Sequence, residues 1–283
     1  MGTCLGHRLS VGQRTISRQH LENNRLGRLQ RKIMTELPIP NHWNQVDAST
    51  TKFWHGSDSE LDYKKHCSNP ESLRKLQEEG WYECHDLTYC FNSQGFRDDE
   101  FDQRPASLAI GCSFTQGIGL KVDQCWPRQL ENLLQKKVWN LGVGGVGLDT
   151  CYRLLEYWIN HLNVDSVFCT VPPMTRYEVF IDQWNQWESF SVHTTFESPH
   201  HWPAWLPSYH KNYMAYDENS ELNRRKNIHA IRDICSQHRV SFYVDYLDNF
   251  GNSASDARDM MHHGPSAHTT LAQDFFEQTK RSL

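Results

Sequence analysis

A serine in a glycine-flanked turn is the first residue of this chain that could carry out chemistry. Ser113 follows Gly111 and Cys112, directly after residues 107–110, which are predicted to form a short buried strand. A tight turn after a strand can expose a hydroxyl nucleophile and bring a backbone N–H group close to it. A serine in such a turn can equally cap the next turn of the chain, so this segment alone does not predict an enzyme.

An aspartate and a histidine three residues apart lie near the C-terminus. Asp259 and His262 belong to residues 256–265, which precede a predicted final helix. An imidazole can accept the proton of a serine hydroxyl, while a carboxylate orients the ring and stabilises its charged form. A lone histidine in this place would more often be a capping or surface residue. Together with the serine turn, the pair favours a Ser-His-Asp interpretation.

A glycine-rich segment follows a second predicted strand. Residues 140–147 read Asn-Leu-Gly-Val-Gly-Gly-Val-Gly, a spacing that does not match the dinucleotide-binding pattern GxGxxG. The glycines could serve only the packing of a helix against the strand. The alternative is that the backbone N–H group of Gly145 helps to bind an oxyanion, because glycine lets the backbone approach a bound group closely.

The elements that must position these segments are predicted from alternating apolar strands and amphipathic helices. We expect strands at residues 107–110, 138–141, 166–171 and 240–246 and helices at about 126–136, 149–162, 222–238 and 266–280. This alternation predicts an α/β fold with a mostly parallel sheet covered on both faces. Ligands of such sheets gather at the carboxyl ends of the strands, which is where the serine and glycine segments lie.

In this order, the motifs Gly-x-Ser, Asn-x-Gly-x-x-Gly and Asp-x-x-His resemble those of the SGNH (GDSL-type) hydrolase family, over about residues 107–280. The resemblance implies a three-layer α/β/α sandwich with a doubly wound, flavodoxin-like sheet, and a serine esterase that works through an acyl-enzyme without a cofactor. By position, it makes Ser113 the nucleophile, His262 the general base and Asp259 its orienting carboxylate. The backbone N–H groups of Ser113 and Gly145 would be the oxyanion donors.

The chain departs from the pattern of that family at two positions. Cys112 replaces the aspartate of Gly-Asp-Ser, which removes no catalytic group. The asparagine that the family places after the third strand is missing, and loss of an oxyanion donor typically costs about a hundredfold in rate. Thr175 and Arg176 are the nearest candidates for an oxyanion or substrate contact, although Glu178 could instead hold Arg176 as a structural pair.

An aromatic-rich insertion, at about residues 172–217, shows little regular pattern between Ile181 and Tyr216. It contains Trp184, Trp187, Trp202 and Trp205. Indole faces pack well on sugar rings and acyl chains, so these residues are a candidate platform for an acylated carbohydrate. A hydrophobic cluster that anchors the insertion is the alternative. The corresponding alternative function is a catalytically weakened domain that binds a glycan or a protein partner.

Length and composition favour one catalytic domain with additions. We expect a flexible or extension segment at residues 1–33, an irregular subregion packed on the core at 34–104, and the hydrolase domain at 105–283. The net charge of −5, with basic residues scattered along most of the chain, argues against a nucleic-acid partner. The expected partner is a small-molecule or glycan ester substrate.

Histidines and cysteines are numerous but lack the spacing of metal sites. The candidate ligands are His200-His201, His262-His263 and His268. Adjacent histidines are poor chelating pairs and CxxC pairs are absent, so no metal is expected. The nine cysteines are predicted to be reduced, mostly buried thiols. Neither a membrane-spanning segment nor a secretory leader is recognisable, so the expected location is cytoplasmic.

Overall fold

A parallel four-stranded sheet lies at the centre of the described part of the chain, which comprises residues 47–196, 202–247 and 256–281 of this computed structural model. Its strands are β3 (Ala106–Ile110), β4 (Val138–Asn140), β5 (Val164–Val171) and β8 (Ser241–Tyr246). They lie in the order β4-β3-β5-β8, and every neighbouring pair is parallel. The predicted α/β fold with a parallel sheet is therefore confirmed, and the predicted segment 1–33 lies outside the described residues.

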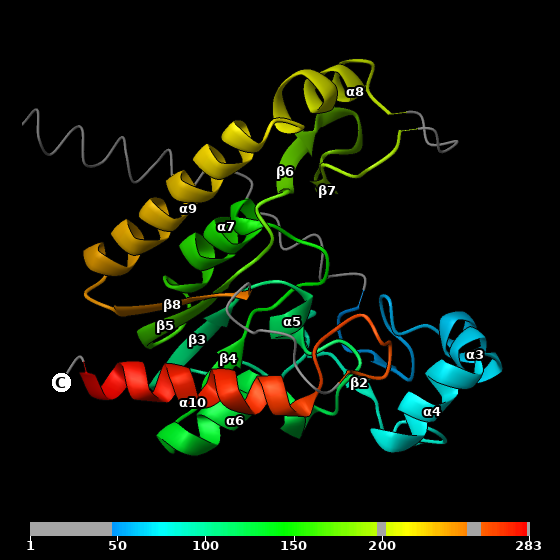
Figure 1. The fold of residues 1–283 in the computed structure, drawn as a ribbon. Coiled ribbons are helices and arrows are strands. Elements are labelled where there is room, and N and C mark those ends of the chain that lie inside the picture. The colour runs from blue at the N-terminus through cyan, green and yellow to red at the C-terminus, as the bar shows by residue number, and fades with distance from the viewer. Residues whose placement is uncertain (1–46, 197–201, 248–255, 282–283) are drawn as a thin grey trace, which may run out of the picture. The chain divides into compact units, whose positions relative to one another are not determined.

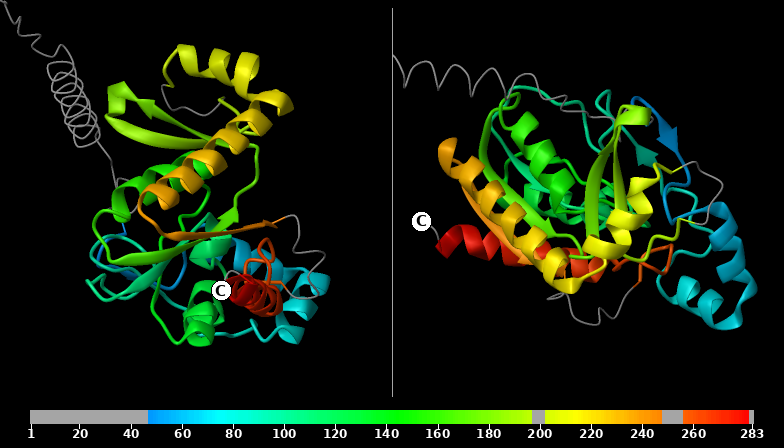
Figure 2. Two further views of the ribbon diagram at one scale, coloured as in Figure 1. Left: turned by 90° about the vertical axis from the view of Figure 1, so that its left-hand side faces the viewer. Right: turned by 90° about the horizontal axis from the view of Figure 1, so that it is seen from above.

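Two helices cover each face of this sheet (Figure 1). On one face lie α7 (Leu148–Trp158) and α9 (Asp217–Gln237), and on the other lie α6 (Trp126–Leu134) and α10 (Pro265–Arg281). The further views in Figure 2 show the same three layers. Of the helices in the described ranges, none combines the length and apolarity that crossing a membrane requires.

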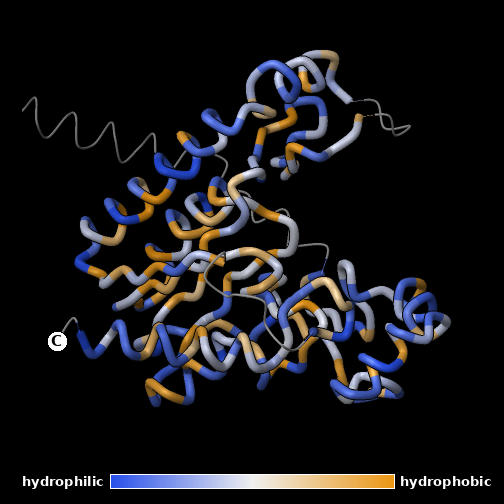
Figure 3. The backbone as a smooth tube through the Cα atoms, viewed as in Figure 1, coloured by the Kyte–Doolittle hydropathy of each residue, from blue (hydrophilic) through white to orange (hydrophobic). Residues whose placement is uncertain are grey.

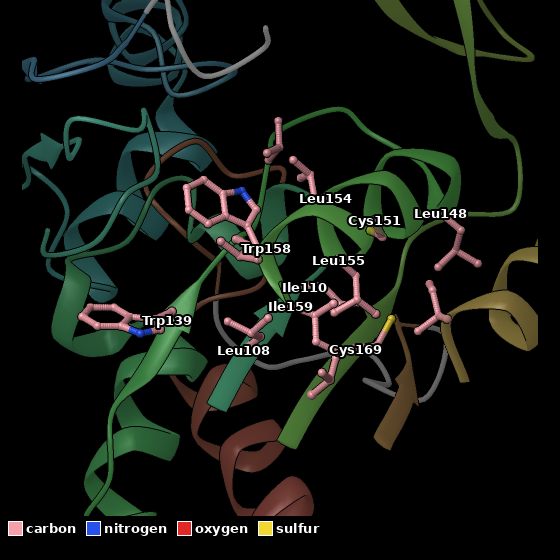
Figure 4. Close-up of a cluster of buried hydrophobic side chains, with 14 of the residues drawn as sticks. Leu108, Ile110, Trp139, Leu148, Cys151, Leu154, Leu155, Trp158, Ile159 and Cys169 are labelled. Carbon is pink, nitrogen blue, oxygen red and sulfur yellow. The ribbon is translucent and has the colours of Figure 1, made fainter. Parts of the chain in front are cut away.

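The alternation of side chains along the strands explains the two faces. Leu108 and Ile110 of β3 pack in one hydrophobic cluster with residues of α7 such as Leu155 (Figure 4), while Ala109 packs in a second cluster with α6 and α10. Successive residues of a strand point to opposite faces, so a fully buried run such as β3 needs cover on both sides. Along α9 and α10, hydrophobic and hydrophilic residues alternate (Figure 3), as expected of helices with one buried face.

The region that precedes the sheet forms two short helices and a small ribbon. They are α3 (Glu60–Ser68), α4 (Pro70–Glu78) and the antiparallel pair β1 (Thr51–Lys52) and β2 (Tyr89–Cys90). The segment from Pro70 to Leu76 carries a short helical signal in the sequence and predicts α4, whereas no signal predicts α3. The reason is that α3 buries no residue and so has no apolar periodicity, whereas α4 buries Leu76.

The insertion has more regular structure than its sequence predicts. β6 (Arg176–Ile181) and β7 (Gln186–Ser191) form an antiparallel hairpin through the 3₁₀ turn η2 (Asp182–Trp184), and α8 (Trp205–Tyr209) continues into a π-helical turn, η3 (His210–Met214). The expected lack of regular pattern after Ile181 is therefore wrong. Among the residues of β7 only Trp187 and Phe190 are strongly apolar, and they fall on opposite faces, so the strand period is hidden in the sequence.

A buried ion pair ties the region before the sheet to the loop before α10. Arg258 Nη2 lies 2.6 Å from Asp58 Oδ2, and both side chains are 1% exposed. Arg258 also donates to the carbonyl oxygen of Phe53 at 2.8 Å, and its guanidinium stacks 4.2 Å from the ring of Trp54. Tyr89 donates its hydroxyl to Asp58. These contacts hold residues 53–58 against residues 256–262, where Asp259 and His262 lie.

Removing one member of this pair is expected to destabilise the fold strongly, because an unpaired charge would remain buried. For Asp58→Ala we expect the free energy of unfolding, measured by urea denaturation, to fall by about 3–5 kcal/mol. Glu78→Ala breaks the exposed pair between Arg74 and Glu78 and serves as the control, with an expected loss below about 1 kcal/mol. Similar losses in the two variants would contradict this interpretation.

Candidate active site

The turn that carries Ser113 is fixed by tight packing beneath it. Ser113 is the first residue of α5 (Ser113–Gln116), a single helical turn that begins three residues after the end of β3. Gly111 has φ +158°, and a Cβ atom there would lie 2.1 Å from Thr115 Oγ1 and 2.3 Å from Thr170 Oγ1. Only glycine fits this position without displacing its neighbours. The chain can therefore turn at once from the strand into α5, with Ser113 at its start.

The structure brings the three predicted catalytic residues into one chain of hydrogen bonds. His262 Nε2 lies 2.7 Å from Ser113 Oγ, and His262 Nδ1 lies 2.6 Å from Asp259 Oδ2. The carboxylate can only accept, so Nδ1 carries the proton of the neutral imidazole and Nε2 accepts from the serine hydroxyl. This is the arrangement that makes a hydroxyl a stronger nucleophile.

The Asp259 carboxylate has further donors besides His262. Ser57 Oγ donates to Asp259 Oδ2 at 2.7 Å, and the backbone N–H groups of Met261 and His262 donate to Oδ1 at 3.2 and 3.1 Å. Burial raises the pKa of Asp259, but the hydrogen bond from His262, the charge of that ring when it is protonated, and the hydrogen bonds from Ser57 and Met261 outweigh it. The pKa of Asp259 therefore lies below its ordinary value. Asp259 is therefore a carboxylate at neutral pH.

Ser113 and His262 line a cavity of about 520 Å³. Such a volume is typical of small-molecule sites. Gly144 and Gly145 of the glycine segment and Arg176 of β6 also line it. The region before the sheet contributes four further lining residues, Asp47, His55, Gly56 and Ser57.

The glycine segment presents an open backbone to this cavity. Gly145 has φ +78°, and no atom lies within 4 Å of the place that its Cβ would occupy. Among the described residues, neither the N–H group of Ser113 nor that of Gly145 donates a hydrogen bond. Asn140 links the two segments, because its Nδ2 donates to Thr115 O at 2.9 Å and its Oδ1 accepts from the N–H group of Gly142 at 2.9 Å.

The residues considered as substitutes for the missing asparagine lie in different places. Arg176 lines the cavity, and its Nη1 donates to the carbonyl oxygen of Val146 at 3.4 Å. Thr175 is not among the lining residues, and its carbonyl oxygen accepts from the N–H group of Val192. Glu178 pairs with Arg153 at 2.6 Å rather than with Arg176, so the alternative that Glu178 holds Arg176 is wrong.

The four tryptophans of the insertion do not line the cavity that contains Ser113. Trp184 and Trp202 pack against the cluster around Tyr177 and Phe190, with their own rings 5.3 Å apart. Trp187 packs edge-on against Phe180, and Trp205 is 44% exposed beside Tyr209. The packing of Trp184 and Trp202 is that of a cluster anchoring the hairpin. A role of the tryptophans as a substrate platform stays a prediction.

Several residues of this site carry no signal in the sequence. Besides Ser57, they are His55 and Gln116, whose Nε2 atoms lie 3.3 Å apart in the wall of the cavity. His55 Nδ1 lies 3.6 Å from Asp47, and burial lowers the pKa of His55, against the opposing charge of Asp47. The amide oxygen of Gln116 is buried and has no hydrogen-bond partner among the described residues. No spacing rule links these positions to Ser113.

The histidines considered for metal binding have other surroundings. His200 and His201 lie outside the described residues, and the described ranges hold no group of three His, Cys, Asp or Glu side chains that could bind a metal. His263 lies beside the ring of Phe114, 5.2 Å between centroids. His268 is buried, and its Nδ1 accepts from the N–H group of Trp126, the first residue of α6. It satisfies one of the free N–H groups at the start of that helix.

Comparisons with known proteins give only distant likenesses. No protein-family model and no curated sequence matches the chain. Among solved structures, the crystal structure of TesA is 14% identical, with a TM-score of 0.35, and the match covers 63% of this chain and 99% of that one. A member of the lipolytic protein G-D-S-L family from Veillonella parvula is 13% identical, with a TM-score of 0.33 and coverages of 62% and 99%.

A third structure is an acetyl xylan esterase, Est2A, from Butyrivibrio proteoclasticus. It is 12% identical with a TM-score of 0.34, and the match covers 65% of this chain and 66% of that one. At TM-scores below 0.5 these likenesses carry no weight for function. The functional interpretation therefore rests on the geometry of the site.

The environment of His268 makes stability depend on pH. Burial, with smaller effects of His263 and His262, lowers its pKa from 6.5 to about 3 in the folded chain. As the pH falls, His268 of the unfolded chain therefore takes up a proton before His268 of the folded chain does. The contribution of neutral His268 to the free energy of unfolding is complete above pH 6.5 and is lost as the pH falls towards 3.

From this group alone, we expect the free energy of unfolding to decrease by up to about 1.4 kcal/mol per pH unit between pH 6 and pH 4. His268→Asn keeps an acceptor for Trp126 and removes the titration, so its pH dependence, measured by urea denaturation, should be shallower. Equal slopes in wild type and variant would show that His268 does not contribute.

Proposed function

We propose that this chain is a serine-dependent ester hydrolase. The observation that carries the proposal is the continuous chain of hydrogen bonds from Asp259 through His262 to Ser113, with the serine facing a cavity of ligand size. A structural role alone would not require an imidazole nitrogen 2.7 Å from a hydroxyl in a cavity wall. The proposed reaction uses side chains and backbone N–H groups of the protein, together with water.

In the first half of the reaction, Ser113 Oγ attacks the ester carbonyl as His262 Nε2 takes its proton. The Asp259 carboxylate stabilises the imidazolium that forms. The negative charge that develops on the carbonyl oxygen is bound by the N–H groups of Ser113 and Gly145, which are available in the described structure. The intermediate then collapses: the C–O bond to the alcohol breaks, His262 returns its proton to the leaving oxygen, and the acyl group remains on Ser113.

The second half repeats these steps with water. His262 removes a proton from a water molecule that attacks the acyl carbon, and the same N–H groups bind the second oxyanion. Collapse of this intermediate breaks the bond to Ser113 Oγ, which regains its proton from His262. The products are a carboxylic acid and the free serine.

The missing asparagine affects the expected rate and the substrate. With two backbone donors in place of three groups, the reaction would be slower by about a hundredfold unless another donor substitutes. Arg176 lines the cavity and is therefore the better placed substitute, while Thr175 lies outside the lining.

As natural substrates we propose esters of small acids, with an acylated carbohydrate as the leading class. The exposed ring of Trp205 is the surface that suits a sugar.

The direct test compares the hydrolysis of p-nitrophenyl acetate and butyrate by wild type and single variants. In both Ser113→Ala and His262→Ala, we expect kcat/KM to fall by about 10³-fold or more, because the nucleophile and its base act as a unit. His263→Ala is the matched control, since it removes the adjacent histidine and should retain turnover. Circular dichroism checks that each variant is folded. Undiminished turnover in Ser113→Ala would remove this serine from the mechanism.

A further inference from the structure

We infer that the substrates of this site carry a carboxylate close to the ester, and that Arg176 binds it. This inference rests on the proposed hydrolase function and names its substrate class. It follows from the charges in the wall of the cavity. Only Arg176 among the described lining residues is a lysine or arginine, and it shares the cavity with Ser113 and His262.

The guanidinium of Arg176 has few partners in the described structure. It has five N–H donors. Among the described residues, its hydrogen-bond acceptor is the carbonyl oxygen of Val146, at 3.4 Å. Within the described ranges, no carboxylate lies within 4.0 Å of it. By comparison, the charge of Asp47 in the same wall is already balanced by an ion pair with Lys52. In the described part of the cavity wall, Arg176 therefore carries a positive charge without a carboxylate partner and has N–H donors left for a ligand.

Neighbouring carboxylates do not compete for Arg176, because each has partners of its own. Glu178, two residues along β6, pairs with Arg153 and accepts the hydroxyl of Thr150 at 2.8 Å. Asp149 accepts from the side-chain amides of Asn223 and Asn227 at 2.8–3.2 Å. Within the described part of the chain, Arg176 therefore has no carboxylate partner and is available to an anion that enters the cavity.

The backbone around Arg176 is held in place beside the proposed oxyanion donors. Arg176 is the first residue of β6 and pairs with Ser191 of β7. Gly147 packs directly against it, since a Cβ atom at Gly147 would lie 2.7 Å from Arg176 O. Because Val146 and Gly147 follow Gly145 directly, the guanidinium lies next to the segment where the ester carbonyl would bind. A group bound there would belong to the same molecule as the ester.

The chemistry of guanidinium favours a carboxylate as this group. Its planar fork matches the two oxygens of a carboxylate, and it forms hydrogen bonds to charged oxygens that are stronger than those to neutral ones. Partial burial in the cavity strengthens this attraction relative to water. The expected substrates are therefore half-esters of dicarboxylic acids or esters of hydroxy acids and uronic acids, in which a carboxylate lies a few bonds from the ester.

The test uses pairs of esters that differ only in charge. Monoethyl succinate and monoethyl glutarate are compared with their neutral amides, ethyl succinamate and ethyl glutaramate. For wild type, we expect kcat/KM to favour the better-fitting anionic ester by about 10- to 100-fold, the range of one hydrogen bond to a charged group. Arg176→Gln should bring this ratio close to one, Arg176→Lys should keep part of it, and Arg176→Glu should reverse it. Any loss common to both esters cancels in the ratio.

Arg225→Gln is the matched control, because it removes the same charge from the exposed surface of α9. It should leave the ratio unchanged. Dissociation constants of the same esters, measured by NMR titration on Ser113→Ala, test recognition without turnover and should show the same preference and the same dependence on Arg176. Equal binding of charged and neutral esters, or a preference that survives in Arg176→Gln, would overturn the inference. Preferential binding without Ser113-dependent turnover would overturn only the proposed hydrolase function.

Discussion

Asp259 bears a charge on a side chain with no exposed surface, and a buried charge of this kind must be satisfied by hydrogen bonds. Its donors come from the His262 ring, from two backbone N–H groups and from Ser57, some 200 residues earlier in the chain. Because His262 must turn Nδ1 towards this carboxylate, its Nε2 faces Ser113. Because Ser57 must reach the same carboxylate, residues 53–58 lie against the loop, where the pair of Asp58 and Arg258 holds them.

The sheet and its four covering helices could be predicted from the sequence, because the strands are short apolar runs and the helices carry an apolar face. The chemical motifs were also recognisable, since each directly follows a strand or precedes a helix. Contacts between distant segments left no such signal: nothing in residues 53–58 indicates that Ser57 reaches Asp259. The exposed helix α3 and the strand β7 were missed for a related reason, because neither has the apolar pattern of a buried element.

The cavity combines contributions from four parts of the described chain. The segments that follow β3 and β4 supply Ser113 and the lining glycines, and the loop before α10 supplies His262. The region before the sheet supplies Asp47, His55, Gly56 and Ser57. Arg176, from the start of the inserted hairpin, adds a positive charge to the wall. The proposed proton transfer depends on groups that are all present.

The most direct measurement of the central claim is labelling with a fluorophosphonate, which reacts with serines activated by a neighbouring base. Attack by the serine oxygen on phosphorus expels fluoride and leaves a stable phosphonate ester, which intact-mass analysis and peptide mapping can locate. If Ser113 is activated as proposed, one adduct forms on the peptide that contains it, and its rate of formation falls sharply in His262→Ala. No adduct on folded wild-type protein, or an adduct on another residue with Ser113 unmodified, would contradict the account.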